Sequence, residues 1–136
     1  VDCLLQVDIA HEETKFGMDD EQIEQLLISE TFKELENVRI CGLMGIGSIT
    51  DDMNQTQKEF HHLQELFERI KERFFQNKDS FKHLSMGMSH DYEVAISEGS
   101  TLVRIGSSIF EQLPKRMVLP TFPTLKQSSQ WMMWQA

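Results

Sequence analysis

Strand-type and helix-type segments alternate four times along the first 110 residues of the chain. The strand-type segments are residues 3–9, 38–49, 81–86 and 101–105. The first of them is nearly continuously apolar, which is typical of a parallel strand covered on both faces. Because parallel strands need a crossover connection between them, this spacing predicts an α/β fold with a parallel sheet and right-handed crossovers.

Two of the intervening segments carry clear helix signals. Asp19 and Gln22 form a capping-box variant, and the helix that follows is expected to end between residues 32 and 35. The longest predicted helix starts at residues 51–54. Its apolar residues recur at spacings of three and four and are Phe60, Leu63, Phe67, Ile70 and Phe74. This stripe predicts a helix that packs on the core rather than a cofactor box.

Residues 84–110 are interpreted as a strand, a helix, a second strand and the start of another helix. Ser89 offers a hydroxyl at an N-cap position, and Gly99 ends the helix that Ser89 would begin. One face of this helix is expected to carry Tyr92, Ala95 and Ile96.

The turn after the last predicted strand is a candidate anion site. Gly106, Ser107 and Ser108 open this turn, and the first N–H groups of a helix have no intrahelical partner. Arg104 lies two residues before the glycine, and Ser89 lies fifteen residues before the arginine. Because parallel strands feed loops at the same end of a sheet, both loops are expected to converge on one ligand. The spacing alone equally fits a surface arginine and two helix-capping serines.

Charge and cysteine content narrow the classes of partner. The 136 residues carry a net charge of −9, with 22 acidic against 13 basic side chains and no basic stripe. Nucleic acid and anionic membranes are therefore not expected as partners. Cys3 and Cys41 stand alone in apolar segments, which indicates reduced core residues of a cytoplasmic protein. The sequence shows neither a secretory signal nor an apolar run of membrane-spanning length.

Four segments together resemble the pyridoxal-phosphate (PLP) homeostasis proteins, whose barrel is related to the N-terminal domain of alanine racemase. They are LLQVDIAHEETKFG at residues 4–17, VRICGLMGIGSI at 38–49, SMGMSHD at 85–91 and EGSTLVRIGSSIF at 98–110. The resemblance covers residues 4–110, and several linked motifs make it specific.

The resemblance implies a site for pyridoxal 5′-phosphate. In that family, the serines of the SMGMS segment and the backbone after the arginine face the cofactor phosphate, and the arginine faces the pyridine nitrogen. The matching cofactor-binding positions here are Ser85, Met86, Ser89, Arg104, Gly106 and Ser107. An arginine that stays charged keeps the pyridine nitrogen unprotonated, which weakens the ring as an electron sink.

The resemblance, together with the number of β/α units, implies about half of a (β/α) barrel of the TIM and alanine racemase type. A full barrel has eight β/α units and typically ~250 residues, whereas four units are recognised here. Residues 1–110 are expected to form the C-terminal half of a PLP-binding barrel, without the strand that carries the family's Schiff-base lysine. Residues 111–136 depart from the family and are expected to form a non-homologous, flexible tail that ends in WMMWQA.

The leading functional hypothesis is a non-enzymatic, cytoplasmic protein that binds PLP and takes part in intracellular PLP homeostasis. One alternative is a fragment of an amino-acid racemase-type PLP enzyme. It is disfavoured because Tyr92, the only tyrosine, sits early in a helix and no second domain is recognised. The other alternative is an inactive half-barrel that serves as an assembly module. Self-association, or pairing with an N-terminal half-barrel, is expected because residues 3–9 and 101–105 would leave two unpaired sheet edges.

Some further positions carry predictions of their own. Asp8 replaces an asparagine that is usual in the family, so its charge needs a partner. His11 and Lys15 superficially match a zinc-binding helix motif, but lysine is not a usual zinc ligand, and Lys15 is predicted to be a structural or rim cation. The interior of the barrel is expected to be lined by residues such as Leu5, Val7, Leu43, Leu84 and Val103.

Overall fold

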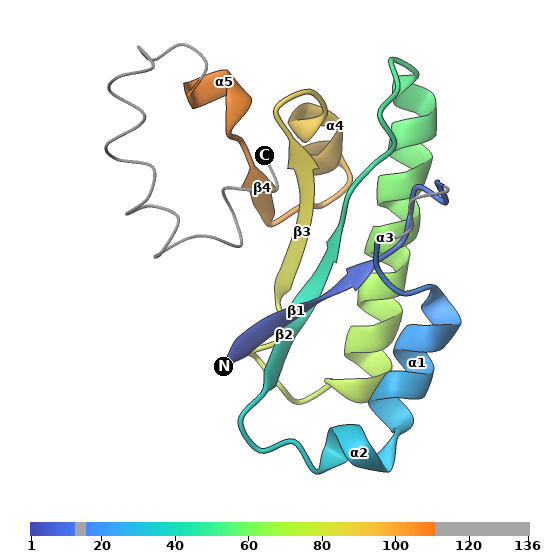
Figure 1. Cartoon of the computed structure of the whole chain (residues 1–136), viewed down its shortest axis with the longest axis vertical. Helices are drawn as coiled ribbons and strands as arrows, with labels where there is room; N and C mark the ends of the chain where they lie inside the picture. The colour runs from blue at the N-terminus through green and yellow to red at the C-terminus, as the bar shows by residue number, and fades with distance from the viewer. Residues whose placement is uncertain (13–15, 111–136) are drawn as a thin grey trace.

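A computed structural model of the chain describes residues 1–12 and 16–110, and these form a parallel sheet with helices between its strands (Figure 1). The elements in chain order are β1 (Asp2–Val7), α1 (Asp20–Ile28), α2 (Glu30–Lys33), β2 (Arg39–Gly45), α3 (Met53–Phe74), β3 (His83–Met88), α4 (Tyr92–Ser97), β4 (Leu102–Arg104) and α5 (Ser107–Phe110). The strands lie in the order β1-β2-β3-β4, and every neighbouring pair is parallel. The predicted α/β class, with four β/α units, is confirmed.

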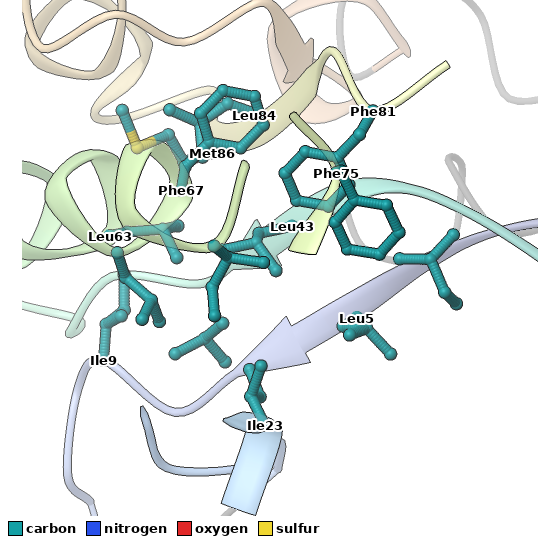
Figure 2. Packing of buried hydrophobic residues seen from close by; sticks show 14 of the residues in the cluster. Leu5, Ile9, Ile23, Leu43, Leu63, Phe67, Phe75, Phe81, Leu84 and Met86 are labelled. Carbon is teal, nitrogen blue, oxygen red and sulfur yellow. The ribbon is translucent and has the colours of Figure 1, made fainter. Parts of the chain in front are cut away.

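Helices α1 and α3 pack together on one side of the sheet (Figure 1). The apolar stripe predicted for α3 is confirmed, because Phe60, Leu63 and Ile70 have no exposed surface. Phe81 stacks between Phe67 and Phe75, with ring centroids 5.1 Å and 4.4 Å away. Figure 2 shows several of these side chains in one cluster between α3 and the strands. No helix of the described residues has both the length and the apolar character to cross a membrane.

The two faces of the sheet are the reverse of those predicted. Leu5, Val7, Leu43 and Leu84 are buried in the core under the helices, as Figure 2 shows for three of them. The barrel-interior face instead carries side chains such as Leu4, Gln6, Met44 and Leu102, all of which are half-buried. The prediction assigned the more apolar set of alternating residues to the barrel interior, whereas that set packs under the helices and the interior face carries Gln6, Ser85 and Arg104 beside its apolar groups.

The segment predicted as a single helix to residues 32–35 is two helices. The capping box at Asp19 and Gln22 is confirmed, but α1 ends before Ser29, whose backbone is extended at φ −63° and ψ 143°. The Ser29 hydroxyl accepts the N–H of Phe32 at 3.2 Å and so caps α2. A serine that bonds locally to the backbone ended the first helix and began the second. In α4, the residues expected on one face differ in burial, because Ala95 is fully buried whereas Ile96 is 55% exposed.

Adjacent residues on β2 test the assignment of the two faces. Leu43 is fully buried under the helices, whereas the neighbouring Met44 lies on the opposite, half-buried face. We predict that Leu43→Ala lowers the free energy of unfolding by about 2–5 kcal/mol because it leaves a cavity in the core. Met44→Ala, the matched control, should cost clearly less. Urea unfolding measures both changes, and an equal or larger loss for Met44→Ala would contradict the assignment.

Candidate functional site

The carboxyl ends of β2, β3 and β4 lie at the same end of the sheet, and Arg104 links the two outer strands of this group. Arg104 is the last residue of β4, and its Nη2 donates a hydrogen bond to the carbonyl of Gly45 at 2.7 Å. Gly45 is the last residue of β2, which lies on the far side of β3. The guanidinium therefore reaches across the end of β3.

The guanidinium of Arg104 is buried and only partly satisfied. Arg104 is 2% exposed, and its Nε and Nη1 atoms have no hydrogen-bond partner among the described residues. Burial lowers the pKa of Arg104 to about 10, and the negative charge of Asp91 opposes that shift. Arg104 is therefore a cation at neutral pH, and two of its nitrogens are unpaired among the described residues at this end of the sheet. Native proteins seldom leave such groups without a partner unless a ligand or water supplies one.

The loops after β3 and β4 meet, as their spacing predicted. Ser89 follows β3, and its hydroxyl accepts the backbone N–H of Ser108 at 3.2 Å. The predicted N-cap role of Ser89 is wrong, because the N-cap residue of α4 is Asp91. Two more residues of turn separate Ser89 from the helix, so its hydroxyl is directed to the neighbouring loop instead.

Ser107 is the first residue of α5, and Gly106 directly precedes it beside this contact. The carbonyl of Gly106 accepts the N–H groups of Ile109 and Phe110 at 3.0 and 2.8 Å. Gly106 is buried, and Ser107 is half-buried. The structure thus places Ser89, Gly106 and Ser107 at the end of the sheet to which Arg104 also belongs.

Ser85 and Met86 are neighbours on β3 but belong to opposite faces. Ser85 lines a cavity of about 570 Å³ on the barrel-interior face, together with Arg104. Met86 is fully buried in the core under the helices (Figure 2). Its side chain is therefore remote from the cavity, and its carbonyl already accepts a hydrogen bond from the Ser100 hydroxyl at 2.7 Å. Any contact of Met86 with a ligand has to come from the main chain.

The loop after β2 is held by a carboxylate that sequence reasoning missed. Glu59 of α3 accepts the N–H of Ser48 at 2.9 Å with one oxygen and the Ser48 hydroxyl at 2.6 Å with the other. Gln55 also donates to this hydroxyl at 3.3 Å. In the sequence, Glu59 is one of many acidic residues on the polar face of α3, and no pattern separates it from the others. The clamp fixes the segment that follows Gly45.

The remaining predicted positions lie at the rim or outside the described residues. Asp8 has a partner, because one of its oxygens accepts the N–H of His11 at 3.1 Å. Lys15 lies outside the described residues, as do residues 111–136 of the predicted tail.

Comparison with known proteins gives a consistent result. The profile of the family "Alanine racemase, N-terminal domain" matches residues 1–114. The pyridoxal phosphate homeostasis protein of Aquifex aeolicus is 40% identical over 109 residues, which are 80% of this chain and 46% of that protein. The protein of the same name from Helicobacter pylori is 41% identical over 114 residues, 82% of this chain and 46% of that protein. The chain spans about half the length of the curated relatives it matches.

Solved structures show the same similarity in three dimensions. PipY of Synechococcus elongatus with PLP bound has a TM-score of 0.65 at 27% identity, over 80% of this chain and 48% of that chain. A protein from Bifidobacterium adolescentis, described as unknown, has a TM-score of 0.70 at 36% identity, over 81% of this chain and 43% of that chain. The resemblance inferred from the motifs is confirmed, and the four-stranded sheet is part of a TIM-barrel-like fold.

Two arginines of the chain should titrate very differently. Burial lowers the pKa of Arg104 to about 10, whereas hydrogen bonding to Asp2 raises the pKa of Arg39 above its usual value. We predict that the guanidinium carbon of Arg104 titrates in NMR spectra with a midpoint near pH 10. Arg39, the internal control, should show no titration up to about pH 12.

The sign of the linked stability follows from the same shift. Because folding lowers the pKa of Arg104, the unfolded state binds this proton more tightly. At a pH below the folded pKa of about 10, the buried charge of Arg104 destabilises the folded state by its full amount. This destabilisation disappears as the pH rises from about 10 to the pKa that Arg104 has in the unfolded chain. A midpoint for Arg104 as high as that of Arg39 would contradict the burial argument.

Proposed function

Because the chain belongs to the alanine racemase N-terminal domain family, we propose that it binds pyridoxal 5′-phosphate and serves intracellular PLP homeostasis. In this proposal, residues 1–110 are the C-terminal half of a PLP-binding barrel. The observation that carries the proposal is the buried guanidinium of Arg104. Two of its nitrogens lack an acceptor among the described residues, and it lies at the end of the sheet where two serine-containing loops meet. The names of the curated relatives and the PLP-bound state of PipY support it.

The donors at the site suit the two polar ends of PLP. A pyridine nitrogen is a hydrogen-bond acceptor, and Arg104 has unpaired N–H groups to offer. A phosphate dianion suits the hydroxyl of Ser89 together with Ser107 and the backbone at Gly106. Ser85 and Arg104 both line the cavity on the barrel-interior face. The volume of this cavity, about 570 Å³, is within the range of small-molecule sites.

We further infer that the protein holds the cofactor without catalysing a reaction. Bound PLP supplies an electron sink, and that sink is strong only when its ring nitrogen is protonated. Arg104 is a cation at neutral pH and has no proton that it readily gives up, so it favours the unprotonated ring nitrogen. Racemases of the same lineage also use an arginine at this place, so Arg104 alone does not separate a carrier from an enzyme. The carrier is favoured because Tyr92, the only tyrosine of the sequence, is the first residue of α4 and is no candidate for a catalytic tyrosine. A racemase-type enzyme would exchange the α-proton of an added amino acid in deuterated water, whereas a carrier would not. We place this function in the cytoplasm, in keeping with the free thiols of Cys3 and Cys41.

A substitution at Gly106 tests the phosphate part of the site. Gly106 is buried at the start of α5, so the branched side chain of Gly106→Val should obstruct a ligand that approaches this backbone. We predict at least a roughly tenfold loss of PLP affinity in calorimetry. Ser97→Val, an exposed change on α4, is the control and should bind as the wild type does. Unchanged affinity in a folded Gly106→Val protein would show that the phosphate lies elsewhere.

We also propose that the barrel-interior face pairs with a second half-barrel, either another copy of this chain or an N-terminal half. In the described sheet, β1 and β4 are the edge strands, and edge strands offer unpaired N–H and C=O groups. The same face carries the half-buried side chains of Leu4, Met44 and Leu102 around the cavity. A second half-barrel would satisfy the edges and cover these apolar groups.

Sedimentation velocity tests this pairing with the chain alone. We predict association that depends on concentration in the low micromolar range, because apolar faces and strand edges both favour it. Met44→Glu should weaken the association by placing a charge on the interior face. Ile96→Glu places the same charge on the exposed side of α4 and should have no effect. A compact species of 15.9 kDa at all concentrations would contradict the proposal.

A further inference from the structure

The imidazole of His61 lies between two carboxylates that come from different helices. His61 belongs to α3, and its Nδ1 is 3.0 Å from Oε2 of Glu98, the C-cap residue of α4. Its Nε2 is 3.2 Å from Oε1 of Glu65, one turn further along α3. A neutral imidazole carries one N–H and can donate to only one of these carboxylates, whereas an imidazolium donates to both. The positions of the two carboxylates therefore suit a protonated ring.

Glu98 is the part of this contact that belongs to α4, and α3 occupies both of its oxygens. Gln57 donates to Oε1 at 2.9 Å, and the ring of His61 lies at hydrogen-bond distance from Oε2. The side chain of Glu98 is 14% exposed, whereas that of His61 is 57% exposed. The carboxylate is thus largely shielded between the two helices, while the ring that faces it can exchange protons with solvent. A change in the charge of His61 acts directly on the contact between α3 and α4.

Helix α4 has few local interactions of its own. It has six residues, and Asp91 at its N-cap makes no side-chain capping bond within the described part of the chain. Its last turn contains no basic residue, and Glu98 adds a negative charge at the C-terminus, where the helix dipole favours a cation. A helix of this length is not stable by itself in water. An imidazolium beside Glu98 therefore compensates a charge that is unfavourable for the helix.

The position of α4 in the chain connects it with the candidate site. The helix is the crossover between β3 and β4, with Ser89 in the turn before it and Ser100 in the connection after it. The Ser100 hydroxyl donates to the carbonyl of Met86 at 2.7 Å, which ties the end of the crossover to β3. The Ser89 hydroxyl accepts the N–H of Ser108 at 3.2 Å. The segment that α3 holds through Glu98 therefore joins the two loops of the site.

We propose that His61 is a pH-sensitive latch, which holds α4 against α3 when its ring is protonated and releases this hold when the ring is neutral. Gln57 continues to donate to Glu98 in both states, so release loosens the crossover without unfolding it. Only the effect on the cofactor site, through the turn that contains Ser89, rests on the proposed function. The hold on α4 itself is a property of the ligand-free chain.

The direction of the pH dependence follows from the contacts. The hydrogen bond to Glu98, and then the charge of Glu65, raise the pKa of His61 above its usual value. The docked helix therefore binds this proton more tightly than a released helix does. The stabilisation is complete below the usual histidine pKa of about 6.5 and is lost as the pH rises through the raised value. Bonds from Gln57 and His61 lower the pKa of Glu98, so this carboxylate stays charged over the same range.

Other titratable groups lie near the latch or near α4. Lys58 and His62 line the same surface hollow as His61, and His62 is 3.0 Å from Asp20 of α1. His90, in the turn before α4, is 3.3 Å from the N-cap carboxylate of that helix. Variants at both of these histidines are therefore the controls for His61.

Amide hydrogen exchange of residues 92–97, corrected for the intrinsic exchange rate, measures the latch in the ligand-free protein. We expect the protection of these amides in the wild type to fall roughly two- to fivefold between about pH 5.5 and about pH 8. His61→Gln should show no such fall, because glutamine can still donate to Glu98 but carries no charge. His62→Gln, the matched control at the next position of α3, and His90→Gln should both keep the wild-type fall.

The same fall in His61→Gln as in the wild type, or an NMR titration of His61 at or below the usual histidine pKa, would overturn the inference. Calorimetry with PLP tests whether the latch reaches the site. The wild type should bind PLP more tightly than His61→Gln at about pH 6 and equally at about pH 8. Equal affinity at about pH 6, together with different protection, would overturn the role of the latch at the site. If neither protein binds PLP, the proposed function fails, and the exchange measurement still decides whether His61 holds α4.

Discussion

The buried guanidinium of Arg104 is the interaction on which the arrangement of the site depends. One of its nitrogens bonds the Gly45 carbonyl at 2.7 Å, while Nε and Nη1 have no partner among the described residues. Removing a cation from water is costly unless hydrogen bonds and a counter-charge compensate for it. Among the described residues this compensation is partial, so an acceptor supplied by a ligand would complete it. This incomplete pairing is the reason why we propose that Arg104 binds a ligand.

The rest of the fold keeps that guanidinium in place. Arg104 and Gly45 are the last residues of β4 and β2, so in this parallel sheet the side chain has to cross only the end of β3 to reach Gly45. Packing of α3 against one face sets this register, since Phe60 and Leu63 are fully buried beneath the strands. In the part of the chain that the structure describes, α1 and α3 pack on that face, and the cavity lies on the opposite one. Glu59 of α3 also holds the loop after β2 in place, because it accepts two hydrogen bonds from Ser48.

Reasoning from sequence succeeded where local patterns decide the structure. The four β/α units, the capping box at Asp19 and the apolar stripe of α3 follow from spacing and short-range chemistry. The meeting of the loops at Ser89 and Ser108 followed from the common direction of parallel strands. The face assignment of Leu43 and its equivalents failed because the more apolar set of alternating residues packs under the helices and does not line the barrel interior. The role of Glu59 depends on a contact between elements that are distant in the sequence, and no spacing in the sequence indicates it.

We propose that Arg104 presents a charged donor to the ring nitrogen of the cofactor, and ¹⁵N NMR of PLP labelled at that nitrogen can detect this contact. We expect that in the complex at neutral pH the nitrogen is unprotonated, with a chemical shift displaced from that of free PLP by a hydrogen bond. Arg104→Met should abolish that displacement. A protonated ring nitrogen in the complex, or a shift that is the same with and without Arg104, would contradict this role of Arg104.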